Sequence, residues 1–191
     1  MDKRNFMISI AVLASSLTAC STTPPRVAGE ARAPSSSPNP TPAGQPPPAE
    51  PPGPDAIERL LATDRDPRRT EIALAALSQV GTPYAWGGHS PITGFDCSGL
   101  VTYVYRRTSK LVLPRLASAQ ARSAQPVDLN DLRAADLVFY NTLGDEFSHV
   151  GIYIGQERFV HAPATGSWVQ IARVSAPYWR SRFSGARRVI A

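Results

Sequence analysis

Cysteine is scarce in this chain, since its 191 residues include only Cys20 and Cys97. Two cysteines exclude a scaffold held by several disulfides, and they exclude a zinc module with four cysteine ligands. Charged residues make up 18% of the chain and aromatic residues 8%, and neither value describes a fully disordered or fibrous protein. The length is close to that of one domain, for which roughly 150 residues is usual.

A long apolar run is also missing near the N-terminus. The uncharged run over residues 6–17 has twelve residues, whereas crossing a bilayer takes about 20. Two basic residues precede this run and small residues follow it, which is the pattern of a secretory signal peptide. We therefore expect residues 1–19 to be removed as a signal peptide.

Residues 17–20 read Leu-Thr-Ala-Cys, which resembles a bacterial lipobox. This resemblance implies that Cys20 is lipidated and that the protein is anchored to a membrane by its lipid. Ser21 after the cysteine favours the outer membrane, facing the periplasm. The alternative is an ordinary signal peptide with a coincidental cysteine.

Proline is abundant but confined. Twelve of the 19 prolines lie between residues 21 and 54, where Val27 is the only hydrophobic residue other than alanine. Such a stretch cannot bury enough apolar area to fold, so residues 20–54 are predicted to be a disordered linker with the lipidated cysteine at its start. At about 3.1 Å per residue the linker could reach on the order of 100 Å.

The folded domain is predicted over residues 55–191. It has sixteen basic and twelve acidic residues, a net charge of +4, which suits an anionic polymer or a membrane surface. No recognition helix or base-stacking motif is present, so nucleic acid is not an expected partner.

Hydrophobic periodicity predicts helices first and strands afterwards, which is typical of an α+β fold. The predicted helices cover residues 66–80 and 97–107, with a short third helix over 118–123. The predicted strands cover residues 136–140, 149–154, 159–162, 169–174 and 186–190.

Cys97 lies at the predicted start of a helix, directly after Asp96, a residue that favours the N-cap position. Unpaired N–H groups and the helix dipole create a positive potential there. We therefore predict that the pKa of Cys97 falls below its usual value of about 8.5, as a nucleophilic thiolate requires.

Two histidines lie on consecutive predicted strands, His149 at the start of one and His161 on the next. An imidazole oriented by a second polar group is the arrangement of a general base in a catalytic triad. Side chains alternate along a strand, so the two rings share a face only if the turn has an odd number of residues or a bulge. Residues 155–158 are predicted to contain that turn. With Cys97, the pair could also be counted as zinc ligands, but the sequence lacks a short-spaced ligand pair.

These features resemble the NlpC family of papain-like cell-wall cysteine endopeptidases. The similar segments run in the family's order: Thr82–Tyr84, Gly87–Gly88, Asp96–Val101, Leu113–Arg115, Asp136–Phe139, His149–Tyr153 and His161–Ala162. The resemblance implies a papain-like fold in which N-terminal helices pack on a mostly antiparallel sheet of five to six strands.

The resemblance also implies roles for individual residues. Cys97 is the nucleophile, His149 is the base and proton carrier, and His161 orients His149. Tyr84, with the backbone N–H of Cys97, would stabilise the oxyanion, and Ser98 and Arg115 are assigned with Tyr84 to the oxyanion and substrate side.

The implied reaction is hydrolysis of an amide bond in peptidoglycan stem peptides through an acyl-thioester, without metal or other cofactor. A regulatory or delivery protein is possible but is not identified by the sequence. Two alternatives stay open: a murein-binding scaffold that does not cut, and a thiol amidase or acyltransferase that acts on another amide.

The sequence departs from the family pattern at two places. Leu116 and Ala117 follow the Leu-Pro-Arg segment where many members carry Ser or Thr, so the sequence does not predict the shape of the adjoining substrate subsite. Ala135 replaces the usual glycine before the Asp136 strand, which concerns a turn more than the chemistry. Trp168 and Trp179 are interpreted as core or surface aromatics rather than substrate platforms.

Overall fold

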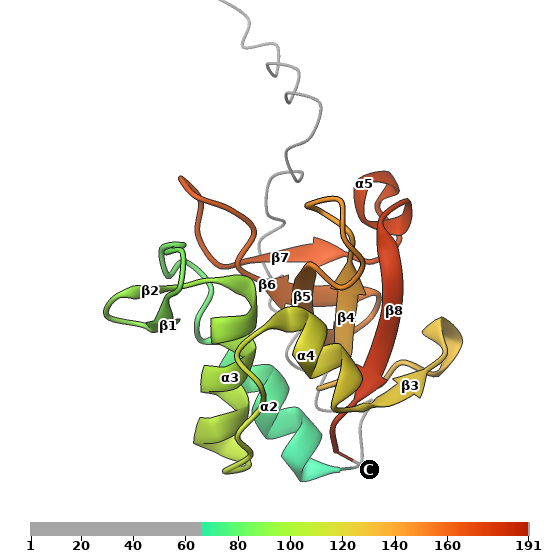
Figure 1. Ribbon diagram of the computed structural model, residues 1–191. Helices are drawn as coiled ribbons and strands as arrows, with labels where there is room; N and C mark the ends of the chain where they lie inside the picture. The colour runs from blue at the N-terminus through green and yellow to red at the C-terminus, as the bar shows by residue number, and fades with distance from the viewer. Residues whose placement is uncertain (1–65, 191) are drawn as a thin grey trace, which may run out of the picture. The chain divides into compact units, whose positions relative to one another are not determined.

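The computed structural model describes residues 66–190 (Figure 1). The predicted signal peptide (1–19), the lipidation site Cys20, the linker (20–54) and the predicted domain start at residue 55 lie outside these residues. Within the described part, no helix combines the length and apolar character needed to cross a membrane.

Helix α2 (Pro67–Leu77) begins where the sequence predicts. Asp66 caps it by accepting a hydrogen bond from the backbone N–H of Arg68 at 2.9 Å, and a proline occupies the first turn, where its missing N–H costs nothing. The helix ends before the predicted Val80, because the following backbone bonds have a three-residue spacing that turns the chain away.

Helix α3 (Cys97–Thr108) also begins at the predicted residue. Asp96 is its N-cap and accepts a hydrogen bond from the backbone N–H of Gly99 at 2.7 Å. Arg106 and Arg107 lie in the last turn, where the helix dipole favours positive charge. The short helix α4 (Ala117–Arg122) lies within one residue of its predicted position.

The main sheet has six antiparallel strands in the order β3-β8-β4-β5-β6-β7, which confirms the predicted fold class (Figure 1). The strands are β3 (Gln125–Val127), β4 (Leu137–Tyr140), β5 (His149–Gly155), β6 (Arg158–His161), β7 (Gln170–Arg173) and β8 (Phe183–Arg188).

Four short features, one of them a hairpin of two strands, were not predicted. The loop before α3 contains a two-stranded hairpin, β1 (His89–Ser90) and β2 (Gly94–Phe95). Strand β3, the 3₁₀ helix η1 (Leu129–Asp131) and helix α5 (Pro177–Arg180) complete the set. None of the four is long enough to carry a hydrophobic period.

Two hydrophobic clusters cover the two faces of the sheet, because alternate strand residues point to opposite faces. Leu137 and Phe139 of β4 belong to the first cluster, which also contains the buried faces of α2 and α3. Val138 and Tyr140 belong to the second cluster, which contains Trp179 of α5. Cys97 packs against the first cluster.

The turn before β4 is held by a buried carboxylate. Asp136 is fully buried and accepts hydrogen bonds from Arg188, at 2.7 and 3.0 Å, and from the backbone N–H of Arg133. Arg69 of α2 forms a further ion pair with it at 3.4 Å. Ala135 just before it adopts a φ of 69°, a conformation that glycine adopts more easily, so this departure from the family pattern does affect a turn.

Candidate active site

A groove of about 510 Å³ contains most of the residues singled out in the sequence. The start of α3 supplies Cys97 and Ser98, and the start of β5 supplies His149. Tyr84 and Arg115 line the same groove from the loops before and after α3. Residues far apart in the sequence therefore meet at one site.

The local backbone around Cys97 is tightly packed. A methyl group on Gly99, in the first turn of α3, would overlap the carbonyl oxygen of Gly88 in the preceding loop. The backbone N–H of Asp96 donates to the same carbonyl at 3.1 Å. Glycine is required at position 99 because the loop and the helix start approach each other so closely, and this contact fixes the position of the sulfur.

Asp96 connects the helix start to the groove wall. Its carboxylate accepts hydrogen bonds from the backbone N–H of Gly87 at 3.0 Å and from the guanidinium of Arg115, also at 3.0 Å. Arg115 donates a further bond to the hydroxyl of Ser98 at 2.9 Å. Ser98 and Arg115 thus form one charge-paired network beside Cys97, although Arg115 is partly exposed.

The two predicted histidines are in direct contact. Nε2 of His149 lies 2.9 Å from Nδ1 of His161, with the ring planes almost perpendicular at 89°. Both rings are buried, and His149 also lines the groove. Because Nε2 of His149 is occupied by this bond, its Nδ1 is the ring nitrogen left to exchange a proton with another group.

The hairpin between β5 and β6 explains how the rings share a face. The register shifts by one residue between Tyr153 and Gly155, which is the bulge that the alternation argument requires. Gln156 and Glu157 then turn the chain, both with positive φ, as the tightest hairpin turns demand. Of the two alternatives that the sequence left open, an odd-numbered turn or a bulge, the structure has the bulge.

Burial dominates the electrostatics of the site. It raises the pKa of Cys97 to about 11, and the nearby Asp96 acts in the same direction. Hydrogen bonds from the backbone of Val150 and Ser98 oppose this effect but are weaker. The prediction of a lowered thiol pKa is therefore wrong, because the loss of solvent around the sulfur outweighs the potential at the helix start.

Burial also disfavours the charged form of both imidazoles, so it lowers their pKa values. Burial lowers the pKa of His149 to about 4, although Asp96 acts to raise it. Burial, followed by the neighbouring His149, lowers the pKa of His161 well below 6.5. At neutral pH these shifts favour a thiol and two neutral imidazoles over a thiolate and an imidazolium.

Tyr84 lies in the groove as a half-buried residue. Burial, and then negative charge on Cys97 and Asp96, raise the pKa of its hydroxyl above 10, so it stays protonated and can donate a hydrogen bond. Its backbone is held by the carbonyl of Ser167, to which its N–H donates at 2.8 Å.

The groove has an apolar rim that sequence reasoning only partly identified. Leu116 and Leu143 line it and are 66% and 70% exposed, and Trp86 lines it with 81% exposure. Leu116 is one of the two residues that depart from the family pattern, and it borders the groove as that departure suggested. The signal for Leu143 was weak, because it lies in an irregular loop between β4 and β5.

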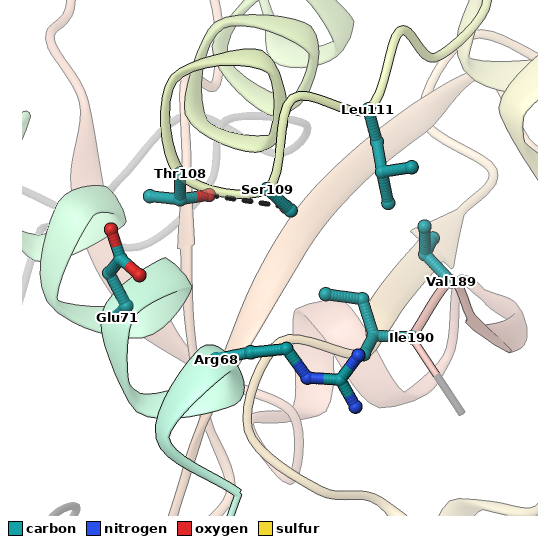
Figure 2. Close-up of a pocket in the computed structure, with 7 residues that line it drawn as sticks. All are labelled: Arg68, Glu71, Thr108, Ser109, Leu111, Val189 and Ile190. Carbon is teal, nitrogen blue, oxygen red and sulfur yellow. Dashed lines mark hydrogen bonds between the residues drawn. The ribbon is translucent and has the colours of Figure 1, made fainter.

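A second hollow of about 370 Å³ lies away from this groove, between the start of α2, the end of α3 and the C-terminal strand. Figure 2 shows its lining residues Arg68, Glu71, Thr108, Ser109, Leu111, Val189 and Ile190. It contains no cysteine or histidine. His89 is exposed in β1 and does not line the groove that contains Cys97. In residues 66–190, no group of three or more His, Cys, Asp or Glu side chains is placed to hold a metal ion.

Comparison with known proteins assigns the family. The family model described as NlpC/P60 matches residues 81–188, which is more than half of the chain. The chain belongs to the NlpC/P60 family. The groove residues from Tyr84 to His149, and His161 behind them, all lie within the matched range of this NlpC/P60 domain.

Relatives of this NlpC/P60 chain include murein DD-endopeptidase MepH of Escherichia coli K12, which is 44% identical over 127 residues. The alignment covers 64% of this chain and 47% of MepH. Probable endopeptidase YafL of the same strain is 42% identical over 135 residues, covering 69% of this chain and 54% of YafL. The chain thus spans about half the length of these relatives.

Solved NlpC/P60 structures resemble the described fold. A protein of Staphylococcus aureus described as similar to lipoprotein, NLP/P60 family, matches with a TM-score of 0.59 and 37% identity, covering 67% of this chain and 43% of that protein. The NlpC/P60 domain of the peptidoglycan hydrolase SagA matches with a TM-score of 0.55 and 30% identity, covering 63% of this chain and 98% of that domain.

Proposed function

We propose that the protein is a peptidoglycan endopeptidase that hydrolyses an amide bond of the stem peptide with a cysteine nucleophile. The observation that carries this proposal is that Cys97 and His149 line one groove, with His161 buried behind them and its Nδ1 2.9 Å from Nε2 of His149. The relatives MepH and YafL, described as a murein DD-endopeptidase and a probable endopeptidase, support the choice of substrate class.

The groove suggests the order of events. The sulfur of Cys97 attacks the amide carbon while its S–H proton passes to Nδ1 of His149. The collapse of the tetrahedral intermediate breaks the C–N bond, and the proton on His149 goes to the leaving nitrogen. Water then attacks the thioester, with His149 as base, and regenerates the thiol.

The other groove residues and His161 support these reaction steps by positioning groups or by stabilising charge. His161 holds His149 in the tautomer whose Nδ1 can accept a proton. The Tyr84 hydroxyl and the backbone N–H of Cys97 would stabilise the oxyanion, and removing one such donor typically costs about 10²–10³ in rate. Arg115 and Ser98 keep the helix start and the groove wall together through Asp96.

The test uses the full chain with isolated murein sacculi. Wild-type protein should release soluble muropeptides, and Cys97→Ala should release none; His161→Asn should retain partial activity because an amide can still hold His149. If wild type and Cys97→Ala release the same fragments, or if neither releases any, the proposal fails. Binding to sacculi without release would favour the scaffold alternative.

Mass spectrometry of the fragments identifies the bond. New amino and carboxyl ends within the stem peptide are expected for an endopeptidase. A fragment that carries an acyl group transferred to another amine, or a cut outside the stem peptide, would indicate the amidase or acyltransferase alternative instead.

We further propose that a lipid on Cys20 anchors the protein to the outer membrane, with the linker carrying the domain into the periplasm. The basic N-terminus, the short apolar run, the Leu-Thr-Ala-Cys segment and Ser21 support this proposal. Labelled palmitate should be incorporated by the wild type and not by Cys20→Ala. Recovery of the wild type in the soluble periplasmic fraction would contradict anchoring.

A further inference from the structure

Trp179 contacts both imidazoles of the candidate site, although the proposed reaction does not use it. It lies in α5 and is 1% exposed. Its ring is stacked on His149 with centroids 5.5 Å apart and planes at 24°. The same indole meets His161 edge to face, at 4.7 Å and 84°.

The indole is itself held firmly. Pro177 occupies the first turn of α5, and the backbone N–H of Trp179 donates to the carbonyl of Ala176 at 2.9 Å. Tyr140 of β4 and Phe159 of β6 pack against the indole with centroids 4.8 and 5.2 Å away. A ring fixed from several sides can fix the planes of the two rings that it contacts.

The stacked geometry also has an electrostatic consequence. In the proposed reaction His149 carries a positive charge for as long as it holds the proton of Cys97. Among the described residues, the ring hydrogen bond of His149 is to His161, a neutral group, and the carboxylate that acts on it is that of Asp96. The face of an indole attracts a cation within about 6 Å, and the stacked ring lies within that range.

We propose that Trp179 is a positioning residue that holds the rings of His149 and His161 in their relative orientation. It also stabilises the imidazolium formed on His149 when Cys97 gives up its proton. The proposal rests on the proposed function, because only proton transfer from the thiol gives the stacked face a charge to stabilise. A cation–π contact corresponds to a change of about twofold at exposed sites to about thirtyfold at desolvated ones in the equilibrium it favours.

The groups that bear on the titration of His149 come from every element around it. Cys97 and Asp96 lie at the start of α3, His161 lies on β6, and Tyr140 lies on β4. None of these groups is itself replaced when Trp179 alone is changed. A shift in the titration of His149 in a Trp179 variant therefore reports the indole.

The decisive variant is Trp179→Phe. Among the described residues nothing accepts a hydrogen bond from the indole N–H, so this change removes no hydrogen bond and keeps an aromatic ring with a weaker attraction for cations. Trp179→Leu removes the ring altogether. Trp168→Phe is the matched control, because Trp168 is 56% exposed and does not line the groove.

Two readouts on the full chain do not depend on peptidoglycan cleavage. In a Cys97→Ala background, NMR titration of the histidine ring signals should give a lower pKa for His149 in Trp179→Phe, and a still lower one in Trp179→Leu. A loss of packing alone would admit water and raise this pKa. With Cys97 intact, alkylation of the thiol by iodoacetamide at pH 8 should slow by about threefold to tenfold in Trp179→Leu.

Muropeptide kinetics complete the test. We expect kcat to fall about tenfold in Trp179→Leu with KM within twofold of the wild type, and less in Trp179→Phe. An unchanged or raised pKa of His149 in Trp179→Phe would overturn the proposal, as would alkylation equal to that of Trp168→Phe. If Trp179→Leu does not fold, the phenylalanine variant decides alone. A lowered pKa in a protein that does not cut murein would reject the proposed function while leaving the effect of the indole on His149 intact.

Discussion

The protonation state of Cys97 gives the sharpest prediction. Burial raises the pKa of this thiol to about 11. At pH 7 only about one molecule in 10⁴ would then carry the thiolate in the absence of substrate. Alkylation by iodoacetamide, which reacts with the thiolate, should therefore rise about tenfold per pH unit from pH 7 to pH 10.

The assay needs one change to the chain. Cys20→Ser leaves Cys97 as the single thiol, so the rate can be followed by mass spectrometry of the intact protein. Glutathione in the same buffers serves as the exposed reference, and its rate should level off as the pH passes its own, lower pKa. Circular dichroism at each pH checks that the protein stays folded.

The outcome distinguishes two physical effects. A rate for Cys97 that is already constant between pH 6 and pH 9 would mean that the helix start and His149 outweigh burial, and the dominance of desolvation at this sulfur would be refuted. In that case His149→Ala should restore the steep dependence, because it removes the cation that pairs with the thiolate.

Three further changes test the fold around the site. Burial lowers the pKa of His149 from 6.5 to about 4, so between these pH values the unfolded chain binds more protons than the folded chain. The free energy of unfolding should therefore fall as the pH falls, by up to about 3 kcal/mol at pH 4. Urea titrations should show a weaker dependence of this free energy on pH for His149→Gln than for the wild type. Asp136→Ala leaves two arginines without their buried partner and should cost about 3–5 kcal/mol, and a melting temperature equal to that of the wild type would contradict the buried network. Gly99→Ala forces a methyl group against the carbonyl of Gly88, so Cys97 should shift and the rate of murein cleavage should fall more than about tenfold. Cleavage at the wild-type rate would contradict this prediction.

Sequence reasoning succeeded where a local rule decides the structure. Asp96 is an N-cap in the sequence and in the structure, and the helix predicted to open at Asp66 and Pro67 has Asp66 as its cap, because a carboxylate beside unpaired N–H groups is stabilising. Alternation along the strands required either an odd-numbered turn or a bulge between the two histidines, and the structure has the bulge. Each of these conclusions depends on neighbours within a few residues along the chain.

It failed where distant segments decide. Pro126 disfavours a strand, yet β3 pairs only with β8 at the edge of the sheet, where a missing N–H is tolerated. Helix α5 has four residues, too few to show a period, so the contacts of Trp179 with the imidazoles had no sequence signal. The predicted pKa of Cys97 was wrong for the same reason, since its burial is produced by parts of the fold that a helix-start rule does not include.

The division of the site between the two hydrophobic clusters has a consequence for how the site is assembled during folding. The thiol belongs to the side built by α3, whereas the rings behind the base belong to the side closed by α5 near the end of the chain. If the proposed function holds, a chain in which α5 has not yet packed should lack the aromatic support of His149 and should not cleave murein.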